Sequence, residues 1–170
     1  MVEKQYTIGT TWNGEQVVLH EHIYVELVMM DGGGLNIQID APFYGDPAPN
    51  QSSGSTWELW NHEVVEVFLV GSDGHYLEAE FGPHGHYLLL QMDAPRSIVT
   101  QEMAVDYVAK IQEKRWQGRA RIAAALLPSP ISRINLFAIH GIAPDRRYMA
   151  WSPLPGSQPN FHQPAHFPHF

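Results

Sequence analysis

Residues 64–92 read VVEVFLVGSDGHYLEAEFGPHGHYLLLQM, and this stretch decides the fold class. It contains three short runs rich in Val, Leu and aromatic residues, namely Val64–Val70, Tyr76–Phe81 and Tyr87–Met92. The Gly-containing segments Gly71–Gly74 and Gly82–Gly85 separate these runs, and such segments are typical of tight turns between strands. The stretch therefore predicts three antiparallel strands joined as a meander.

Further strands are predicted before this meander. The run Gln16–Met30 is rich in Val, Ile, Leu and Tyr, and the glycine-rich Asp31–Gly34 follows it as a hairpin turn. Leu35–Ile39 then alternates apolar and polar residues, which is the pattern of a half-buried strand.

The segments after the meander continue the same pattern. Met103–Ile111 has an apolar residue at every second position, and the alternation resumes over Ala120–Leu126 after a turn expected near Gln117-Gly118. Ile134–Ile142 adds another strand, and the Pro-rich segment from Ser152 onward is expected to lie over the surface as ordered coil. About ten short strands with such turns predict an all-β fold, an antiparallel, jelly-roll-like β-sandwich that forms one domain over residues 1–170.

The composition of the 170 residues excludes several classes of function. The formal net charge is −8 and the 10 Lys and Arg residues are scattered, so no basic cluster is present to neutralise nucleic-acid phosphates or an anionic membrane. The absence of Cys excludes disulfides, thiolate metal sites and a catalytic thiol. Residues 1–10 lack a signal-peptide pattern, and no apolar run approaches the roughly 20 residues of a membrane span. We therefore expect a cytoplasmic protein with neither a nucleic-acid nor a membrane partner.

Tryptophans near strand ends are the first candidates for ligand binding. Trp57 and Trp60 follow a long loop, residues 42–55, that is rich in Pro, Gly and Ser, and Trp151 stands where a strand ends. An aromatic ring can stack on the apolar face of a sugar while nearby polar side chains bond its hydroxyls. The alternative is that these rings cover the rim of the core.

Charged residues inside the predicted strands are the second candidates. Glu66 lies in the first strand of the meander, and Glu78 and Glu80 share one face of the second. Arg119 and Arg121 also share a strand face, and they would pair with these carboxylates if their strands were neighbours. Such a face could bond sugar hydroxyls, or it could be a structural network of ion pairs.

The same carboxylates support an enzyme as an alternative. Residues two apart on a strand are about 7 Å apart, within the roughly 6.5–9.5 Å that separates the two carboxyl groups of inverting glycosidases. Glu78 and Glu80, with His84 on the following turn, would then act on a sugar-like metabolite. Any pair of carboxylates with this spacing meets the same criterion, and nearby Arg side chains would lower the pKa of a general acid.

The sequence predicts no cofactor and no metal site. The patterns His20-x-His22 and His84-x-His86 could each present two rings to zinc, but no third ligand is placed by the sequence. Oxygen ligands for calcium could come from four aspartates in or next to loops, although none of them forms a known calcium-loop pattern. These are Asp31, Asp40, Asp46 and Asp73.

The central stretch resembles a known family. Leu59–Leu69 and Tyr76–Gly85 (LWNHEVVEVFL and YLEAEFGPHG) resemble the core of the family nine carbohydrate-binding modules and of the wider DOMON-like sandwiches. Arg115–Ile122 resembles a later strand of that family, and Tyr148–Pro153 with Phe161–Phe167 resembles its closing segment. The resemblance covers the chain from about residue 35 onward and is closest to small proteins of this fold that stand alone. The sequence departs from the family at residue 62, where it has His and those modules often have an acidic residue.

This resemblance implies non-catalytic binding of a carbohydrate or small ligand through a tryptophan-lined cleft. In sugar-binding members two tryptophans enclose a terminal sugar, and Trp60 and Trp151 stand at the corresponding positions, with Glu66 as a polar partner. The full set of candidate ligand-binding residues is Trp60, Trp151, Glu66, Arg147, Tyr148, Glu78, Glu80 and His84. The resemblance also implies a second alternative, a haem-binding DOMON-like domain with Met and His axial ligands.

Overall fold

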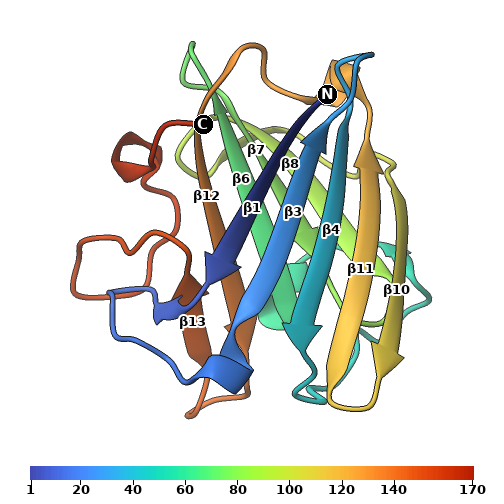
Figure 1. Ribbon diagram of the computed structural model, residues 1–170, viewed down its shortest axis with the longest axis vertical. Coiled ribbons are helices and arrows are strands. Elements are labelled where there is room, and N and C mark those ends of the chain that lie inside the picture. The colour runs from blue at the N-terminus through green and yellow to red at the C-terminus, as the bar shows by residue number, and fades with distance from the viewer.

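The fold consists of two sheets packed face to face, as seen in a computed structural model of residues 1–170 (Figure 1). The five-stranded sheet has the order β1 (Val2–Ile8), β3 (Ile23–Met29), β4 (Leu35–Pro42), β11 (Arg115–Ile122) and β10 (Asp106–Gln112). The eight-stranded sheet has the order β2 (Thr10–Thr11), β13 (Arg147–Ala150), β12 (Ile131–His140), β6 (Val64–Gly71), β7 (Tyr76–Phe81), β8 (His86–Ala94) and β5 (Gly54–Ser55), and β9 (Ser97–Thr100) pairs with β8. All neighbouring strands are antiparallel except the two-residue β5, which is parallel to β8. The predicted all-β antiparallel sandwich is confirmed.

Short 3-10 helices lie in the connections between strands. They are η1 (Leu19–Glu21), η2 (Leu59–Asn61), η3 (Ala124–Leu126) and η4 (Pro164–His166). No helix in the structure has the length and apolar character needed to cross a membrane.

One apolar core fills the space between the two sheets. Every second residue of β4 and β6 points into it, including Ile37 and Ile39 from the first strand and Val67 and Leu69 from the second. Trp116 of β11 is one of the largest side chains in this core and is almost fully buried. The period-two alternation of apolar residues in the sequence places these side chains in the core, since successive side chains of a strand point to opposite faces of the sheet.

The outer face of the eight-stranded sheet is also buried. Phe68, Tyr76 and Phe137 lie on this face, and the segment 152–170 packs over them with Phe161 and Phe167. This segment forms the expected ordered coil, but it contributes buried side chains and is not merely a surface covering. Strand β6 is buried on both faces and its sequence is a nearly continuous apolar run, whereas β7 is equally buried although it contains Glu78 and Glu80.

The first third of the chain differs from the sequence expectation. Strand β1 was not predicted, because only Tyr6 and Ile8 of its seven residues are buried and the others are mostly exposed. The expected strand over residues 16–30 starts only at Ile23, since η1 occupies part of that run. The hairpin turn at residues 31–34 is confirmed, with the Met30 N–H donating to the Gly34 carbonyl at 2.8 Å.

The turn expected near Gln117-Gly118 lies at Glu113-Lys114 instead. Glu113 has a φ of 56°, the left-handed conformation that closes this turn between β10 and β11. Gly118 lies in the middle of β11, where the ring of Tyr107 crosses it so closely that a Cβ atom would come within 2.8 Å of Oη. A glycine inside a strand thus marks a close approach here and not a turn.

Candidate functional site

A cleft of about 410 Å³ opens between the outer face of the eight-stranded sheet and the C-terminal segment. Its volume falls in the range of small-molecule sites, roughly 300–1,000 Å³. Strands β6, β7, β8, β12 and β13 supply its sheet side, and residues 159–162 supply the opposite side. The cleft is the part of the molecule that best fits a binding site.

Aromatic rings form the walls of this cleft. Trp57 and Trp60 flank the start of η2, and their rings meet edge to face with centroids 5.1 Å apart. Tyr148 and Phe161 stand on the C-terminal side, again edge to face, at 6.1 Å. Phe161 is held by stacking on Phe137, with ring centroids 4.0 Å apart and planes within 7°. The cleft therefore has flat apolar surfaces suited to the apolar face of a ring-shaped ligand.

Three carboxylates gather at the floor of the cleft. Glu66 on β6 lies directly opposite Glu80 on β7, and Glu78 is two residues earlier on the same face of β7. One oxygen from each of the three lies within 4.8 Å of the others. Glu66 and Glu78 line the cleft, whereas Glu80 lies beneath the surface with no exposed area.

Burial dominates the electrostatics of this cluster. Desolvation raises the pKa of Glu78 to about 7, and it raises the pKa values of Glu66 and Glu80 well above the usual range. The repulsion of neighbouring carboxylates adds to the increase in the pKa values of Glu66 and Glu80. Both oxygens of Glu80 and Oε2 of Glu78 have no hydrogen-bond partner in the protein. Such unpartnered buried acceptors are rare and costly in folded proteins.

Polar side chains line the rim opposite the floor. The Arg96 guanidinium donates to Oδ1 of Asn160 at 3.1 Å, and the same oxygen accepts the backbone N–H of His162. The Nδ1 atom of His162 is 2.8 Å from the Tyr76 hydroxyl. Burial, with a smaller contribution from Arg96, lowers the pKa of His162 to about 4, so its ring is neutral near pH 7.

Some of the candidate residues do not meet in this cleft. Of the candidates from the sequence, Trp60, Tyr148, Glu66 and Glu78 line the cleft, and Glu80 lies just below it. The expected pairing of Trp60 with Trp151 across one cleft is wrong. Trp151 packs against the core between the sheets, edge to face with Tyr6 at 4.8 Å.

Arg147 and His84 also lie outside the cleft lining. The Arg147 guanidinium pairs with the Glu21 carboxylate at 3.0 Å. His84 lies in the turn between β7 and β8, where its ring meets the edge of Phe43 at 5.7 Å. The enzyme alternative therefore cannot use His84 in this cleft, and the histidine that lines it is His162.

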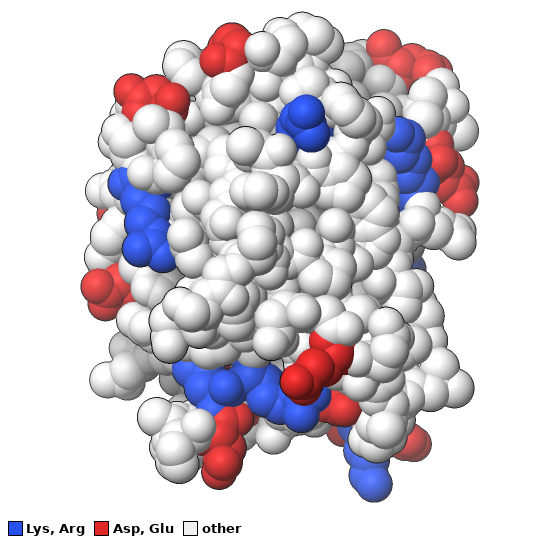
Figure 2. All heavy atoms as spheres, turned by 90° about the vertical axis from the view of Figure 1, so that its left-hand side faces the viewer, with Lys and Arg blue, Asp and Glu red and all other residues white.

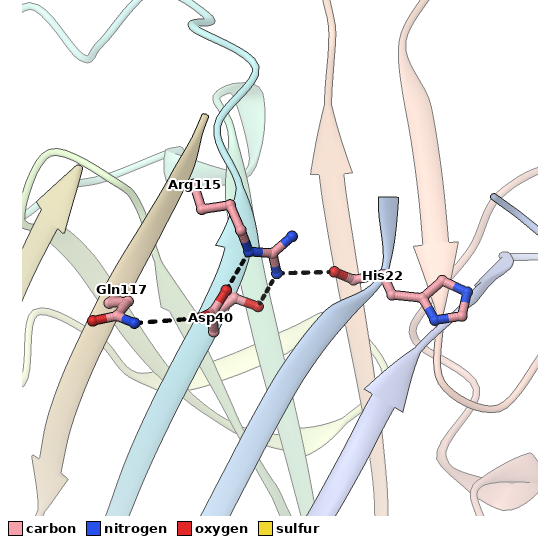
Figure 3. Close-up of polar contacts among 4 residues, drawn as sticks. All are labelled: His22, Asp40, Arg115 and Gln117. Atoms are coloured by element: carbon pink, nitrogen blue, oxygen red, sulfur yellow. Dashed lines mark hydrogen bonds and ion pairs between the residues drawn. The ribbon is translucent and has the colours of Figure 1, made fainter. Parts of the chain in front are cut away.

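The expected arginine partners of these glutamates belong to the other sheet. Arg119 and Arg121 lie on β11, whose neighbours are β4 and β10, so they cannot pair with carboxylates of β6 and β7. Polar groups on the outer face of the five-stranded sheet bond among themselves, as Figure 3 shows for Arg115, which pairs with Asp40 and donates to the His22 carbonyl. These groups have hydrogen-bond or ion-pair partners, whereas oxygens of Glu78 and Glu80 on the other sheet have none.

Reasoning from sequence considered Trp57 but left it out of the final set of candidates, and it missed three other cleft residues. Trp57 stood out as an aromatic residue beside a long loop, and its place three residues before Trp60 was the available signal. Arg96, Asn160 and His162 carried no signal, because they reach the cleft from a turn after β8 and from the distant C-terminal segment.

The loop aspartates and the Met and His side chains of the cleft do not form a metal or haem site. The four loop aspartates do not converge on one point. Asp31 pairs with the N-terminus, Asp40 with Arg115, Asp46 accepts the Gly141 N–H, and Asp73 accepts the His75 N–H. Met92 and His162 both line the cleft, as a Met–His haem site would require. However, the two ring nitrogens of His162 face the Tyr76 hydroxyl and Oε2 of Glu78, at 2.8 and 3.8 Å, so neither is directed to an iron in the open space. These residues do not fit a haem.

Figure 2 shows the side of the molecule that carries β13 and the C-terminal segment. Uncharged atoms cover most of the middle of this face, and charged side chains lie mainly around its edges. Basic and acidic side chains adjoin one another along the lower edge, so this face has no broad basic patch of the kind that nucleic-acid backbones require.

Comparison with known proteins places the chain among relatives from vertebrates. No family model matches it. It is 36% identical to the rat UPF0462 protein C4orf33 homolog over 174 residues, which cover 97% of this chain and 86% of the rat protein. The chain belongs to the UPF0462 family. The human UPF0462 protein C4orf33 is 35% identical and the zebrafish homolog 33% identical, each over 97% of this chain and over 86% and 87% of the relative.

A solved structure shares the fold of this UPF0462 member. It is the crystal structure of a "putative carbohydrate-binding protein" from Bacteroides uniformis, with a TM-score of 0.75 over 96% of this chain and 84% of that chain. The two sequences are 14% identical, so the similarity concerns the fold.

Proposed function

We propose that this UPF0462 protein binds a carbohydrate, or a small polyhydroxylated ligand of similar shape, in the aromatic cleft without changing it chemically. The observation that carries the proposal is a pair of cleft-lining carboxylates, Glu66 and Glu78, set between aromatic walls, with Oε2 of Glu78 lacking a protein donor. The hydroxyl groups of a sugar can donate to such carboxylates, and each buried acceptor that gains a donor recovers free energy. A cleft with these two features is suited to a ligand with one apolar face and several hydroxyls.

Each side of the cleft has a distinct role in this proposal. The rings of Trp60 and Tyr148 stack on the ligand, since C–H groups of a sugar ring pack well against flat aromatic faces. Glu66 and Glu78 accept hydroxyl hydrogen bonds at the floor. Asn160 supplies a side-chain amide and Arg96 a guanidinium at the rim, where both donate to ring or hydroxyl oxygens. The shared fold with the protein from Bacteroides uniformis supports the same class of ligand.

Calorimetric titration with a panel of neutral mono- and disaccharides tests the proposal. We expect the wild-type protein to bind at least one of these sugars, and we expect Trp60→Ala to weaken that binding at least about tenfold. Trp12→Ala, which alters a tryptophan outside the cleft lining, is the matched control and should bind like the wild type. The proposal fails if no sugar binds, or if Trp60→Ala binds as tightly as the wild type.

A second candidate, an enzyme acting on a sugar-like metabolite, is favoured by one observation. Glu66 and Glu78 line the same cleft, and burial raises the pKa of Glu78 to about 7, which suits a group that both donates and accepts a proton near neutral pH. The histidine available to such a reaction is His162. Release of the leaving group from chromogenic aryl glycosides, and loss of that release in Glu78→Gln, would favour this candidate over simple binding.

A further inference from the structure

The three glutamates converge as a consequence of strand register. Glu66 and Glu80 are directly opposite residues of β6 and β7, and Glu78 shares their face of the sheet. Cross-strand neighbours have Cβ atoms about 5 Å apart, so their carboxyl groups meet above the sheet. Like charges at directly opposite positions are unfavourable for sheet stability, and here a third carboxylate joins them.

Basic side chains compensate this arrangement only weakly, through the charges of Arg146 on Glu66 and Arg96 on Glu78. The ion pairs of the structure do not join a Lys or Arg nitrogen to any of the three glutamates within 4.0 Å. Glu80 is fully buried, and both of its oxygens lack a hydrogen-bond partner within this cluster of converging oxygens. Three buried carboxylates this close together are strongly unfavourable when ionised, unless a cation or protons neutralise them.

We propose that Glu66, Glu78 and Glu80 form a calcium site at the floor of the cleft. All the ligand atoms are carboxylate oxygens, the donors that hard cations such as calcium prefer. The three oxygens lie within 4.8 Å of one another, and a calcium shell with Ca–O distances of about 2.3–2.6 Å can hold oxygens up to about 5 Å apart. Magnesium demands a near-ideal octahedron at about 2.0–2.1 Å and usually takes one or two protein carboxylates, so a set of three carboxylates suits calcium better.

The position of the cluster gives a cation access and free coordination places. Glu66 and Glu78 line the cleft, so an ion can enter from there and settle against Glu80 beneath. Three carboxylates supply at most six oxygens, while calcium takes six to eight ligands, so water from the cleft completes the shell. This site goes beyond the proposed function, because it binds its ion without a sugar.

His162 lies beside the proposed calcium site, but it does not coordinate the ion. The Tyr76 hydroxyl oxygen accepts the Arg96 N–H at 3.2 Å, so its own proton is free to be donated to Nδ1 of His162. We assign the proton of the neutral ring to Nε2, which lies 3.8 Å from Oε2 of Glu78, beyond hydrogen-bond distance. In this tautomer neither ring nitrogen has a lone pair free for the ion, so the metal ligands are carboxylates alone.

Protons are the rival occupants of this cluster, and the experiment separates them from calcium. Chelator-treated wild-type protein is titrated with calcium alone at pH 7 by calorimetry, and its melting temperature is measured at each concentration. We expect one calcium per chain and a melting temperature that rises with calcium until the site is saturated. If neither calcium, magnesium nor manganese produces heat or a shift in melting temperature, protons fill the cluster and the proposal is overturned.

Glu80→Gln is the matched variant, because it removes one carboxyl group at a fully buried position and leaves the cleft lining unchanged. We expect its calcium affinity to fall at least tenfold, while without calcium its melting temperature equals or exceeds that of the wild type, since one buried ionisable carboxyl group is gone. Asp73→Asn, at an exposed turn, is the control and should keep the full calcium effect. An undiminished calcium effect in Glu80→Gln would overturn the proposal.

Terbium luminescence provides a test on the wild-type protein that does not depend on any variant folding. Terbium takes the place of calcium in oxygen sites and is excited through nearby indole rings, and Trp57 and Trp60 line the same cleft as Glu66 and Glu78. We expect excitation of tryptophan to produce terbium emission that added calcium abolishes. Absence of this emission, or emission that calcium cannot displace, would contradict the assignment.

Discussion

Asn135 and Ser152 are joined by reciprocal hydrogen bonds. The side-chain amide of Asn135 donates to the Ser152 carbonyl at 2.9 Å, and its Oδ1 accepts the Ser152 N–H at 3.1 Å and the Leu136 N–H at 2.9 Å. Asn135 lies in β12 and is fully buried. Through this residue the sheet holds the first residue of the C-terminal segment, which later forms one wall of the cleft.

Replacement of this amide should be costly. Asn135→Asp keeps the shape but loses the donor to Ser152 and places a charge in a buried position, so we expect the free energy of unfolding to fall by about 1–3 kcal/mol or more. Urea denaturation measures this change. Asn50→Asp, at an exposed loop position, is the control and should be within about 0.5 kcal/mol of the wild type. Equal losses in the two variants would show that Asn135 does not hold the segment.

Substitution of Trp60 should affect ligand binding, whereas substitution of Trp151 should affect stability. Trp151→Ala removes a ring that packs on Tyr6 and the inter-sheet core, so we expect a loss on the order of 2 kcal/mol in the free energy of unfolding with sugar affinity unchanged. Trp60→Ala should show the reverse pattern, with weakened binding and a small change in stability. Calorimetry and urea denaturation on both variants test this, and loss of binding in a stable Trp151→Ala would restore the paired-tryptophan hypothesis.

Gly118 should not tolerate a methyl group. A Cβ at this position would lie 2.8 Å from Oη of Tyr107 and 2.9 Å from the ring of Trp116, so Gly118→Ala forces one of two packed rings to move. We expect a loss of about 1–3 kcal/mol in the free energy of unfolding. Gly32→Ala is the control, because no atom lies within 4 Å of its Cβ position, and its stability should match the wild type.

His140 should make the protein less stable in mild acid. Its ring is buried and stacked on Tyr44 with centroids 3.5 Å apart, and burial, followed by the charge of Arg147, lowers its pKa to about 4. The folded state therefore binds fewer protons than the unfolded state between about pH 4 and 6.5. Its stabilisation is present above this range and is lost as the pH falls, with a total on the order of 3 kcal/mol.

The variant His140→Phe tests this dependence because it keeps the stacking on Tyr44 and removes the titrating group. We expect the difference in free energy of unfolding between variant and wild type to grow in favour of the variant from pH 6.5 to pH 4. Glu63 has the opposite influence, since burial raises its pKa to about 7, but it is present in both proteins and cancels in the difference. A difference that is constant with pH would contradict the assignment to His140.

Local patterns in the sequence predicted the strands of the fold well but not the side of the sheet on which each aromatic lies. Tyr148 and Trp151 were placed in one site, yet residues three apart on an extended chain point to opposite faces. Met149 lies in the core between the sheets, so Trp151, two residues later, follows it inward and Tyr148 points outward. The alternation of side chains along a strand can be read from the sequence, and it would have placed the two rings on opposite faces of the sheet.

The burial of the carboxylates could not be predicted from local patterns. Glu66, Glu78 and Glu80 were correctly placed on strand faces, and the pattern of charged residues suggested a solvated face with arginine partners. Two features of the long-range topology make this face buried and leave it without arginine partners. The strand bearing Arg119 joined the other sheet, and residues 152–170 covered the outer face of the sheet that holds the glutamates.

The contribution of residues 159–162 to the cleft has a consequence during synthesis of the protein. Strands β6, β7 and β8 are adjacent in sequence and can pair while the ribosome is still translating, since the contacts between them are local. Their outer apolar side chains and three carboxylates then stay uncovered until about 70 further residues, including Phe161, have been made. A nascent chain of this protein therefore exposes an aggregation-prone sheet face that also carries carboxylates. It acquires its capacity to bind a ligand only near the end of translation.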